Sequence, residues 1–530
     1  MNEQEKELLP KEKFSFATKT ERAETTLKVK HEGYFQDAFR RFKKNKGSVF
    51  AAIVIFLLAL FAVFGPLFSP YKVDYKDANF KYCEPKSRMS EKFGWDFWDG
   101  CVKKTINERD FLLYKGIFEE TGRCPIKNYQ KGAYKIRPSV EGKRVYSVRY
   151  DTYRAAGVVL MDISSNEYKD LQRYQDEKSR QVVYPATNKK VSFATGSEPT
   201  LSMGDQRNYN YWYKTEVVDG KTQPIFGENG AFIPDYLTLS YDKYGKRADG
   251  YFSQMKIEES DEFAYARAIG KTGRWHVRVD NYEYYLYYHS RVLKDGIEKP
   301  VFLFGTTQEG QDIFTRLAAG ARFSFLFAIV TSLVNMFIGA IYGAVEGYYG
   351  GGVDLAMERV ADILGAIPFI IVITLLKMHF GSGGHLPILF VAFFLTGWMG
   401  MAGTVRMQFY RFKNQEYVLA SRTLGASDRR IMFRHIFPNA LGTIVTRSVL
   451  MIPGMIFSES SLSYLGIINL ESGRLTSVGT MLASAQTQMQ AYPYMMLFPA
   501  LFISLLMLSF NLFGNGLRDA FNPTLRGTED

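Results

Sequence analysis

The sequence predicts a helical membrane protein of about six spans that carries an α+β domain between its first and second spans. Two observations lead to this prediction. Apolar runs long enough to cross the roughly 30 Å hydrocarbon core of a bilayer lie near the N-terminus and again after residue 300. Residues 71–300 contain no such run, and they are rich in charged residues and tyrosine. The mean hydropathy of -0.15 over 530 residues therefore averages two unlike parts.

The first predicted element is a cytoplasmic tail, residues 1–47, which ends in an amphipathic helix over 34–46. Phe35, Phe39 and Phe42 recur at helical spacing with Arg and Lys between them, so this helix is expected to lie on the membrane surface. Basic residues directly before the first span favour a cytoplasmic N-terminus: Arg40, Arg41, Lys43, Lys44 and Lys46. DNA binding is a weaker use for the net charge of +12, which inside loops and lipid headgroups explain more simply.

Residues 48–68 form the first predicted span. The run is longer than the apolar core of a cleavable signal peptide and begins far from Met1. It ends in Gly65-Pro66-Leu67-Phe68, without a small-residue cleavage site. We therefore interpret it as a retained membrane anchor.

Residues 71–300 predict an extracytoplasmic domain of mixed α+β structure, long enough to bury a core of its own. β-branched and aromatic residues in partial alternation predict strands over 144–150 and 275–289, whereas 255–269 is compatible with a helix. The domain contains the only three cysteines of the chain, which permit one disulfide in three possible pairings and do not have the spacing of a metal site: Cys83, Cys101 and Cys124.

Residues 301–530 form the rest of the membrane part. Its predicted spans lie at about 322–346, 355–376, 386–408, 439–459 and 493–516. Glycines at four-residue spacing in the second span predict close helix packing: Gly339, Gly343 and Gly347. Gly365 and Pro368 predict a kink in the third span.

Six spans place both termini in the cytoplasm and residues 71–300 outside. They also place the 409–438 loop inside, and the Arg and Lys residues of that loop agree with this orientation. Polar residues within or at the ends of spans are candidates for a substrate path, since exposing them to lipid is unfavourable: Asn335, Glu346 and Glu459.

Residues 416–438 lie between two long apolar runs and are basic and partly amphipathic. Their first half predicts a helix with Tyr417, Ala420 and Leu424 on one face, ended by Gly425. A second short helix is expected to begin at Ser427 or Asp428 and to stop at Pro438. Two such helices on the cytoplasmic face would form a compact handle for a soluble partner.

This stretch resembles the EAA loop of ABC importer permeases, whose pattern is E-A-A-x-x-x-G followed by I-x-L-P. Ala420, Gly425, Pro438 and their spacing match, whereas Leu419 replaces the glutamate. Other departures from the pattern are Ser421, His435 and Phe437. The resemblance implies that the loop docks into a groove on an ATPase subunit. It assigns the following residues to that contact: Glu416, Tyr417, Leu419, Ala420, Ser421, Leu424, Gly425, Ala426, Ser427 and Pro438.

Further segments resemble, in the correct order, the oligopeptide/dipeptide (OppC/DppC-like) family of these permeases. They are residues 39–46 and 65–71, residues 304–316, which are similar to the family element L-G-T-D-x-x-G-R-D-V-x-S-R, and residues 459–466 and 511–519. Within the 304–316 element, Thr307 and Gln311 replace an aspartate and an arginine. The resemblance implies the type I ABC importer fold, with residues 71–300 as a large insertion.

The same resemblance implies a transmembrane permease subunit of an ATP-driven, binding-protein-dependent importer of peptides, working by alternating access in the cell inner membrane. It implies a second homologous permease, two ATPase subunits (identical or a homologous pair), an extracytoplasmic substrate-binding protein and membrane lipid as partners, and no nucleic acid. No catalytic residue, metal or cofactor of the chain's own is expected, and ATP and Mg²⁺ belong to the ATPases. Gly270-Lys271-Thr272 is like the end of a phosphate loop, but Tyr265 occupies the position of its first glycine.

Two alternatives stay open at the level of sequence. Nickel, glutathione and other small-solute importers share these motifs, so the substrate is not determined. A membrane-anchored extracytoplasmic binding or sensor protein would also have spans and an outer domain, but it would not need the 416–438 loop. For an importer, the inserted domain is expected to dock the external binding protein or to cover the translocation mouth.

Overall fold

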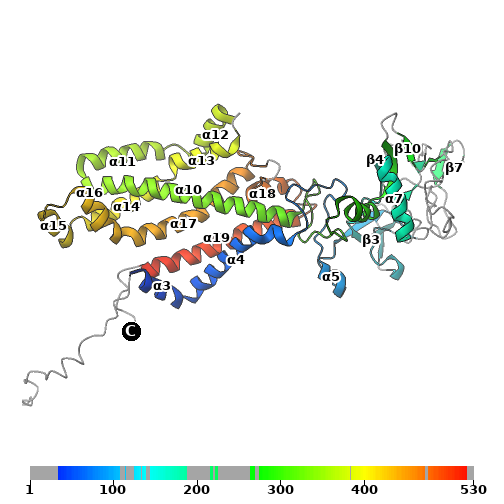
Figure 1. The fold of residues 1–530 in the computed structure, drawn as a ribbon, viewed down its shortest axis with the longest axis horizontal. Helices are drawn as coiled ribbons and strands as arrows, with labels where there is room; N and C mark the ends of the chain where they lie inside the picture. The colour runs from blue at the N-terminus through cyan, green and yellow to red at the C-terminus, as the bar shows by residue number, and fades with distance from the viewer. Residues whose placement is uncertain are drawn as a thin grey trace, which may run out of the picture.

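A computed structural model describes residues 34–107, 124–132, 134–138, 144–184, 186–187, 215–218, 221–224, 263–264, 266–268, 274–381, 384–471 and 475–521, with positions 111, 114 and 118. Figure 1 shows a bundle of long helices and, at one end of it, a domain of strands and short helices. The chain between α4 (Lys46–Phe68) and α10 (Ile313–Tyr349) builds that domain.

The N-terminal helix α3 covers Tyr34–Lys44. The predicted helix over 34–46 is thus confirmed as far as Lys44. Asn45 separates it from α4, because its side chain accepts a hydrogen bond from the Ser48 amide, 3.2 Å away, and caps the span. The Phe42 ring packs edge-on against Phe513 of the C-terminal helix, with ring centroids 5.3 Å apart. The tail helix is therefore fixed to the bundle.

The bundle continues with α11 (Gly351–Gly365), α12 (Phe369–Phe380), α13 (His385–Thr396), α14 (Met399–Phe412), α17 (Phe437–Tyr464), α18 (Val478–Gln486) and α19 (Tyr494–Phe521). Among the described residues, five helices are long and apolar enough to cross a membrane, or six if the bent pair α11–α12 counts as one span. This agrees with the predicted number. The axes of α11 and α12 differ by 72°, which confirms the kink at Gly365 to Pro368.

Three glycines of α10 allow it to approach α14 closely. An added Cβ at Gly339 would lie 2.6 Å from the Trp398 carbonyl oxygen, and one at Gly343 would lie 2.1 Å from that of Ala402. One at Gly347 would meet α14 in the same way, 2.7 Å from a backbone oxygen. The close packing predicted from the four-residue spacing is confirmed.

The inserted domain contains α5 (Arg88–Phe93), β1 (Cys101–Asn107), η2 (Tyr129–Lys131), β2 (Lys135–Pro138), β3 (Arg144–Asp151), β4 (Val158–Ser164), α7 (Ser165–Lys178), β5 (Val183–Tyr184), β6 (Ala186–Thr187), β7 (Thr215–Val218), β8 (Lys221–Pro224), β9 (Phe263–Ala264), β10 (Ala266–Ala268), β11 (Arg274–Asp280), α9 (Asn281–Tyr287) and η5 (Tyr288–Leu293). The strands described are antiparallel in the orders β1-β3-β2, β10-β11-β4 with β5 also on β11, β6-β9 and β7-β8.

The strand predicted over 144–150 is confirmed, but the one over 275–289 is only half right. The strand ends at Asp280, whose carboxylate accepts a hydrogen bond from the Glu283 amide, 3.0 Å away, and starts α9. Tyr284 and Tyr287 then pack on the sheet at helical spacing. The helix considered for 255–269 is wrong for its described part, which forms β9 and β10; the other residues of that range lie outside the described part.

The two ends of the inserted domain meet at the membrane bundle. Tyr71, after α4, stacks on Phe302, before α10, with ring centroids 4.5 Å apart. The Tyr153 hydroxyl also lies in this junction and accepts a hydrogen bond from the Phe302 amide, 3.2 Å away. The three cysteines are free thiols, and Cys83 is wholly buried in the same junction.

Candidate functional site

The segment after α14 folds as a short helix, a turn and the start of a long helix. It contains α15 (Glu416–Thr423), α16 (Asp428–Arg430) and the π-helical stretch η7 (Ile431–Ile436). Gly425 makes the turn with a φ of +81°, and its amide donates to the Arg422 carbonyl, 3.0 Å away. An added Cβ at Gly425 would meet no atom within 4 Å, so the left-handed backbone alone favours glycine here. The predicted helix break is confirmed.

Two details of the second helix differ from the prediction. Ser427 stands at the N-cap of α16, but its side chain makes no capping hydrogen bond. Pro438 does not end the helix. It lies in the first turn of α17, directly after the π-helical stretch, whose wider hydrogen-bond pattern accommodates a residue without an amide hydrogen. One helix therefore runs over Asp428–Tyr464, in place of the expected second short helix.

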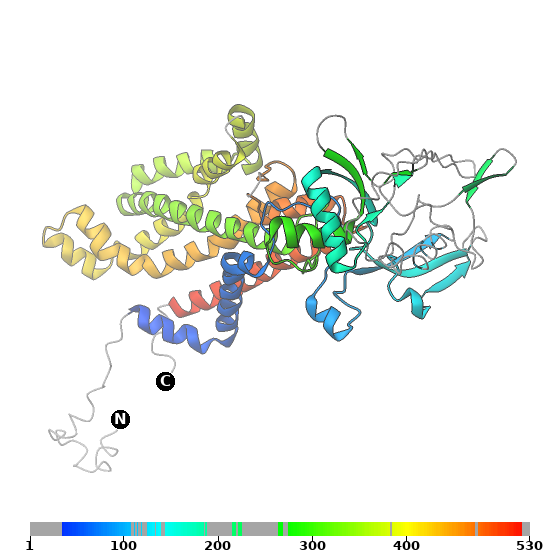
Figure 2. The ribbon, with the colours of Figure 1, turned by 45° about the vertical axis from the view of Figure 1, so that its right-hand side comes forward.

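The outer surface of α15 and its turn is exposed and partly apolar. Leu424 is 88% exposed, and Tyr417, Leu419 and Ala420 are also exposed. Figures 1 and 2 place α15 and α16 at the end of the bundle that is opposite the inserted domain. This end presents large apolar side chains among arginines, a surface suited to a protein partner.

The inner side of the same segment is packed into the bundle. Val418 and Ile431 are fully buried in a cluster with Phe409 of α14. The Tyr348 hydroxyl, at the end of α10, donates to a carboxylate oxygen of Asp428, 2.6 Å away. The segment is therefore attached to both α10 and α14. Sequence reasoning missed Tyr348, because its partner lies 80 residues away along the chain.

Close to this segment, Arg406 of α14 binds two carboxylates of α11. Its guanidinium donates to Asp354 at 2.6 and 2.9 Å and to Glu358 at 2.6 and 2.7 Å. Glu346, a predicted path residue, lies 3.6 Å from the same guanidinium. Carboxylate oxygens of the three acidic residues lie within 4.8 Å of one another, and Arg406 supplies a positive charge between them. The arrangement is an ionic clamp between α10, α11 and α14.

The other two predicted path residues lie elsewhere in the bundle. Asn335 is fully buried in α10, and its side-chain nitrogen donates to the Phe393 carbonyl, 3.2 Å away. Glu459 of α17 is also fully buried, and it accepts hydrogen bonds from Ser463 at 3.0 Å and Ser324 at 3.3 Å. The structure thus spreads the three residues along the bundle, and their role in a substrate path stays a prediction.

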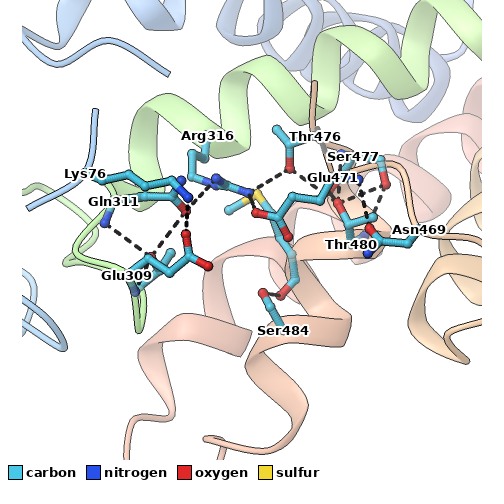
Figure 3. Close-up of polar contacts among 12 residues, drawn as sticks. Lys76, Glu309, Gln311, Arg316, Asn469, Glu471, Thr476, Ser477, Thr480 and Ser484 are labelled. Atoms are coloured by element: carbon cyan, nitrogen blue, oxygen red, sulfur yellow. Dashed lines mark hydrogen bonds and ion pairs between the residues drawn. The ribbon is translucent and has the colours of Figure 1, made fainter. Parts of the chain in front are cut away.

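A second polar network lies at the start of α10, at the end of the bundle that carries the inserted domain (Figure 3). The buried guanidinium of Arg316 donates to Gln311, to Glu471 at 2.6 Å and to Thr476 at 3.2 Å. It therefore links the 304–316 element to the loop after α17. Lys76 and Glu309 form an ion pair beside it and add the start of the inserted domain to the network. The 304–316 motif is visible in the sequence. Glu471, the partner of Arg316, lies 155 residues further along the chain and has no comparable signal.

Comparisons with known proteins identify the membrane part. A family described as "Binding-protein-dependent transport system inner membrane component" matches residues 335–527, and one described as "N-terminal TM domain of oligopeptide transport permease C" matches residues 33–85. The oligopeptide transport permease OppC of Bacillus subtilis is 44% identical over 223 residues, which are 42% of this chain and 72% of that protein. The dipeptide permease DppC of the same organism is 42% identical, over 42% of this chain and 69% of the relative.

More distant relatives include the glutathione transport permease GsiD of Pectobacterium atrosepticum, 36% identical over 42% of this chain and 72% of that protein. Among solved structures, an inward-facing MetNI methionine ABC transporter aligns with a TM-score of 0.32 and 17% identity, covering 39% of this chain and 96% of that one. The aligned B. subtilis relatives, together with both family matches, show that the chain belongs to the ABC importer permeases of the oligopeptide and dipeptide (OppC/DppC) family, a non-enzymatic membrane subunit with an all-helical membrane part.

Proposed function

We propose that this chain is the permease of a peptide importer and that residues 416–438 transmit the movement of partner ATPases to the membrane helices. The observation that carries this proposal is the two-sided character of the segment. Its turn exposes Leu424 and is shaped by Gly425, while its inner side is fixed to α10 through Asp428 and to α14 through buried apolar residues. A membrane anchor for an outer binding domain would not need such an element.

Peptides are the proposed substrate class because the relatives at 44% and 42% identity are named oligopeptide and dipeptide permeases. For this chain we propose the type I importer fold, a second homologous permease beside it, two ATPases on the inner face, and an external binding protein. ATP and Mg²⁺ would be bound by the ATPases, with no cofactor in the permease.

The proposed orientation puts both termini and residues 409–438 in the cytoplasm and residues 71–300 outside. Charge supports this, since basic residues before α4 and in the 409–438 loop gather at the same end of the bundle. The inserted domain stands at the other end, where an external binding protein would arrive (Figure 2). We propose that it docks that protein or covers the translocation mouth.

The test is uptake by proteoliposomes that contain this chain, its sister permease, the ATPases and the binding protein. A labelled tripeptide should accumulate only with ATP inside and binding protein outside, and unlabelled dipeptides and oligopeptides should compete. Glutathione and nickel are the comparison substrates. ATP-driven accumulation of nickel or glutathione without any peptide uptake would contradict the peptide proposal and leave the permease role intact.

A further inference from the structure

An open cavity of about 440 Å³ lies in the inserted domain, where α9 faces the segment that follows the first span. Four tyrosines line it: Tyr75, Tyr284, Tyr285 and Tyr288. The rings of Tyr284 and Tyr288 are nearly parallel, and their centroids lie 6.0 Å apart. The ring centroids of Tyr285 and His289 lie 4.0 Å apart. The size is that of a small-molecule site, and aromatic faces of this kind attract cations.

Carboxylates at the wall add negative charge to the tyrosine rings. Glu167 accepts a hydrogen bond from the Tyr284 hydroxyl at 2.6 Å, and Asp77 accepts one from Tyr75 at 3.4 Å. Burial raises the pKa of Asp77, and a bound cation would favour its charged form. Lys76 does not neutralise this wall, because it pairs with Glu309; Arg274 supplies a positive charge elsewhere in the lining.

Asn281 also lines the cavity, and its side chain has a hydrogen-bond donor, whereas Asp77 and Glu167 have acceptors. Its side chain is only 3% exposed, and the amide nitrogen has no hydrogen-bond partner among the residues that the structure describes. Its backbone amide is fixed by a 2.8 Å bond to the Gly157 carbonyl. Leaving a buried donor unpaired is unfavourable, so a ligand oxygen is the expected partner.

We propose that this cavity binds the ammonium end of an amino acid or a peptide. The ammonium group lies among the tyrosine rings beside Asp77 and Glu167, and the neighbouring carbonyl or carboxylate oxygen accepts from the Asn281 amide. The cavity is connected to the membrane part, because the Asp77 amide donates to the Gly310 carbonyl, 3.2 Å away, in the 304–316 element. The site does not depend on the proposed transport, because every residue that lines the cavity belongs to the inserted domain.

Calorimetry with the full chain in lipid nanodiscs tests this proposal. Alanyl-alanine and free alanine are the probes, and N-acetyl-alanyl-alanine, which lacks the ammonium charge, is the matched control ligand. Alanyl-alanine should bind, and N-acetylation should weaken binding about tenfold or more through loss of the charged hydrogen bonds. Binding of free alanine with the same affinity would assign the site to amino acids, and much weaker binding of alanine would assign it to peptides.

Variants separate the site from the rest of the domain. Asp77→Asn and Asn281→Leu should each weaken alanyl-alanine binding about tenfold, while Glu177→Gln, which removes a charge paired with Arg291 outside the cavity, should not. Asp77→Asn is expected to keep the fold, which the melting temperature checks. Equal binding of the acetylated probe, or no binding of either ammonium probe, would overturn the proposal. Peptide uptake by the full complex is measured separately, so failure here does not bear on the permease role.

A row of exposed aromatic residues lies around α5, apart from the tyrosine-lined cavity. Phe93, Trp95, Phe97 and Trp98 are 39% to 60% exposed. Their rings follow one another, with centroids 5.3 Å apart for Phe93 and Trp95 and 5.2 Å for Trp95 and Phe97. The Trp98 ring is parallel to that of Phe498, 6.4 Å away, in the second turn of the membrane helix α19.

We infer that this aromatic row enters the interface of the lipid leaflet nearest the inserted domain. Its contact with α19 places it at the height where that helix begins, and Trp is enriched at membrane–water interfaces. Arg88 and Lys92 on the same helix α5 offer positive charge to lipid phosphates. The row would then hold the inserted domain at a fixed height above the bilayer.

Spin labels measure this contact in nanodiscs that contain the assembled complex, in a background without the three native cysteines. A label at Phe97→Cys should be more accessible to oxygen than to a water-soluble nickel complex, and a label at the exposed Lys131→Cys should show the reverse. Equal behaviour of the two labels would contradict insertion into lipid. Protection of the Phe97 label from both reagents would overturn it in favour of a protein partner.

Discussion

Glu84 lies in the first part of the inserted domain, and burial raises its pKa to about 7. Its ordinary pKa is 4.5, so between these two values the unfolded chain loses the proton while the folded chain keeps it. The contribution of Glu84 to stability is therefore greatest below pH 4.5, falls as the pH rises to about 7, and is constant above that.

Glu84→Gln stays neutral at all these pH values and should remove this loss. We expect the variant to melt at a higher temperature than the wild type at about pH 8, with a smaller difference at about pH 5. Differential scanning calorimetry in nanodiscs measures both. Glu177→Gln, an exposed carboxylate of the same domain, is the control. A difference that does not depend on pH would contradict the assignment.

Tyr348 is the residue that connects α10 to the start of the long helix after Gly425. Tyr348→Phe removes the hydroxyl that donates to Asp428 and should weaken the local attachment by about 1 kcal/mol. Amide hydrogen exchange over 416–430 should become faster. The neighbouring Tyr349→Phe, where the ring is 53% exposed, should leave that exchange unchanged. The same exchange rate in both variants would show that the hydroxyl does not fix the segment.

At the scale of elements, α10 and α14 depend on the missing Cβ of a glycine. Gly343→Ala would place a methyl group 2.1 Å from the Ala402 carbonyl oxygen, against backbone that cannot move independently. We expect a loss of about 1–3 kcal/mol, seen as a lower melting temperature of the purified chain. Gly403→Ala, on the facing helix with no atom within 4 Å, should be tolerated. Equal melting temperatures would refute close packing at this point.

Elements with a local signal were predictable, and elements that depend on distant partners were not. The Gly425 break follows from one residue, and the Gly339–Gly347 spacing gave the packed face of α10. The second half of 275–289 was mistaken for a strand, because tyrosines favour both strands and buried helices. The helix is favoured by the packing of Tyr287 against the core around β4 and β11, which the sequence does not show. Pro438 was mistaken for a helix end, because no pattern of residues marks the π-helical stretch before it.

For the whole molecule, the sequence predicted two unlike parts and the number of spans, while the sheet orders of the inserted domain were beyond it. β11 pairs with β4, more than a hundred residues earlier, with Val277 opposite Met161. Such pairing is set by the packed core and not by neighbouring residues. The Arg316 network also depends on distant residues. The 304–316 motif can be found in the sequence, but the pairing of Arg316 with Glu471 cannot.

Orientation is a prediction for the whole chain. In a background with the three cysteines replaced by alanine, Lys131→Cys on intact cells should react with an impermeant maleimide. Asn414→Cys should react only after permeabilisation, although both positions are exposed in the structure. The reverse pattern of labelling would place the inserted domain in the cytoplasm.

The central claim is that the 416–438 segment couples ATP hydrolysis to peptide transport, and Gly425→Val in the reconstituted complex tests it most directly. A β-branched residue resists the φ of +81°, so the turn should be displaced while the helices stay inserted. Peptide uptake per ATP hydrolysed should fall at least about fivefold, as expected for a non-glycine residue forced into strained backbone of about 1–3 kcal/mol. Thr423→Val, a β-branched change in α15 that keeps an ordinary helical backbone, should transport normally. Normal peptide uptake and normal substrate-stimulated ATP hydrolysis by Gly425→Val would contradict the claim.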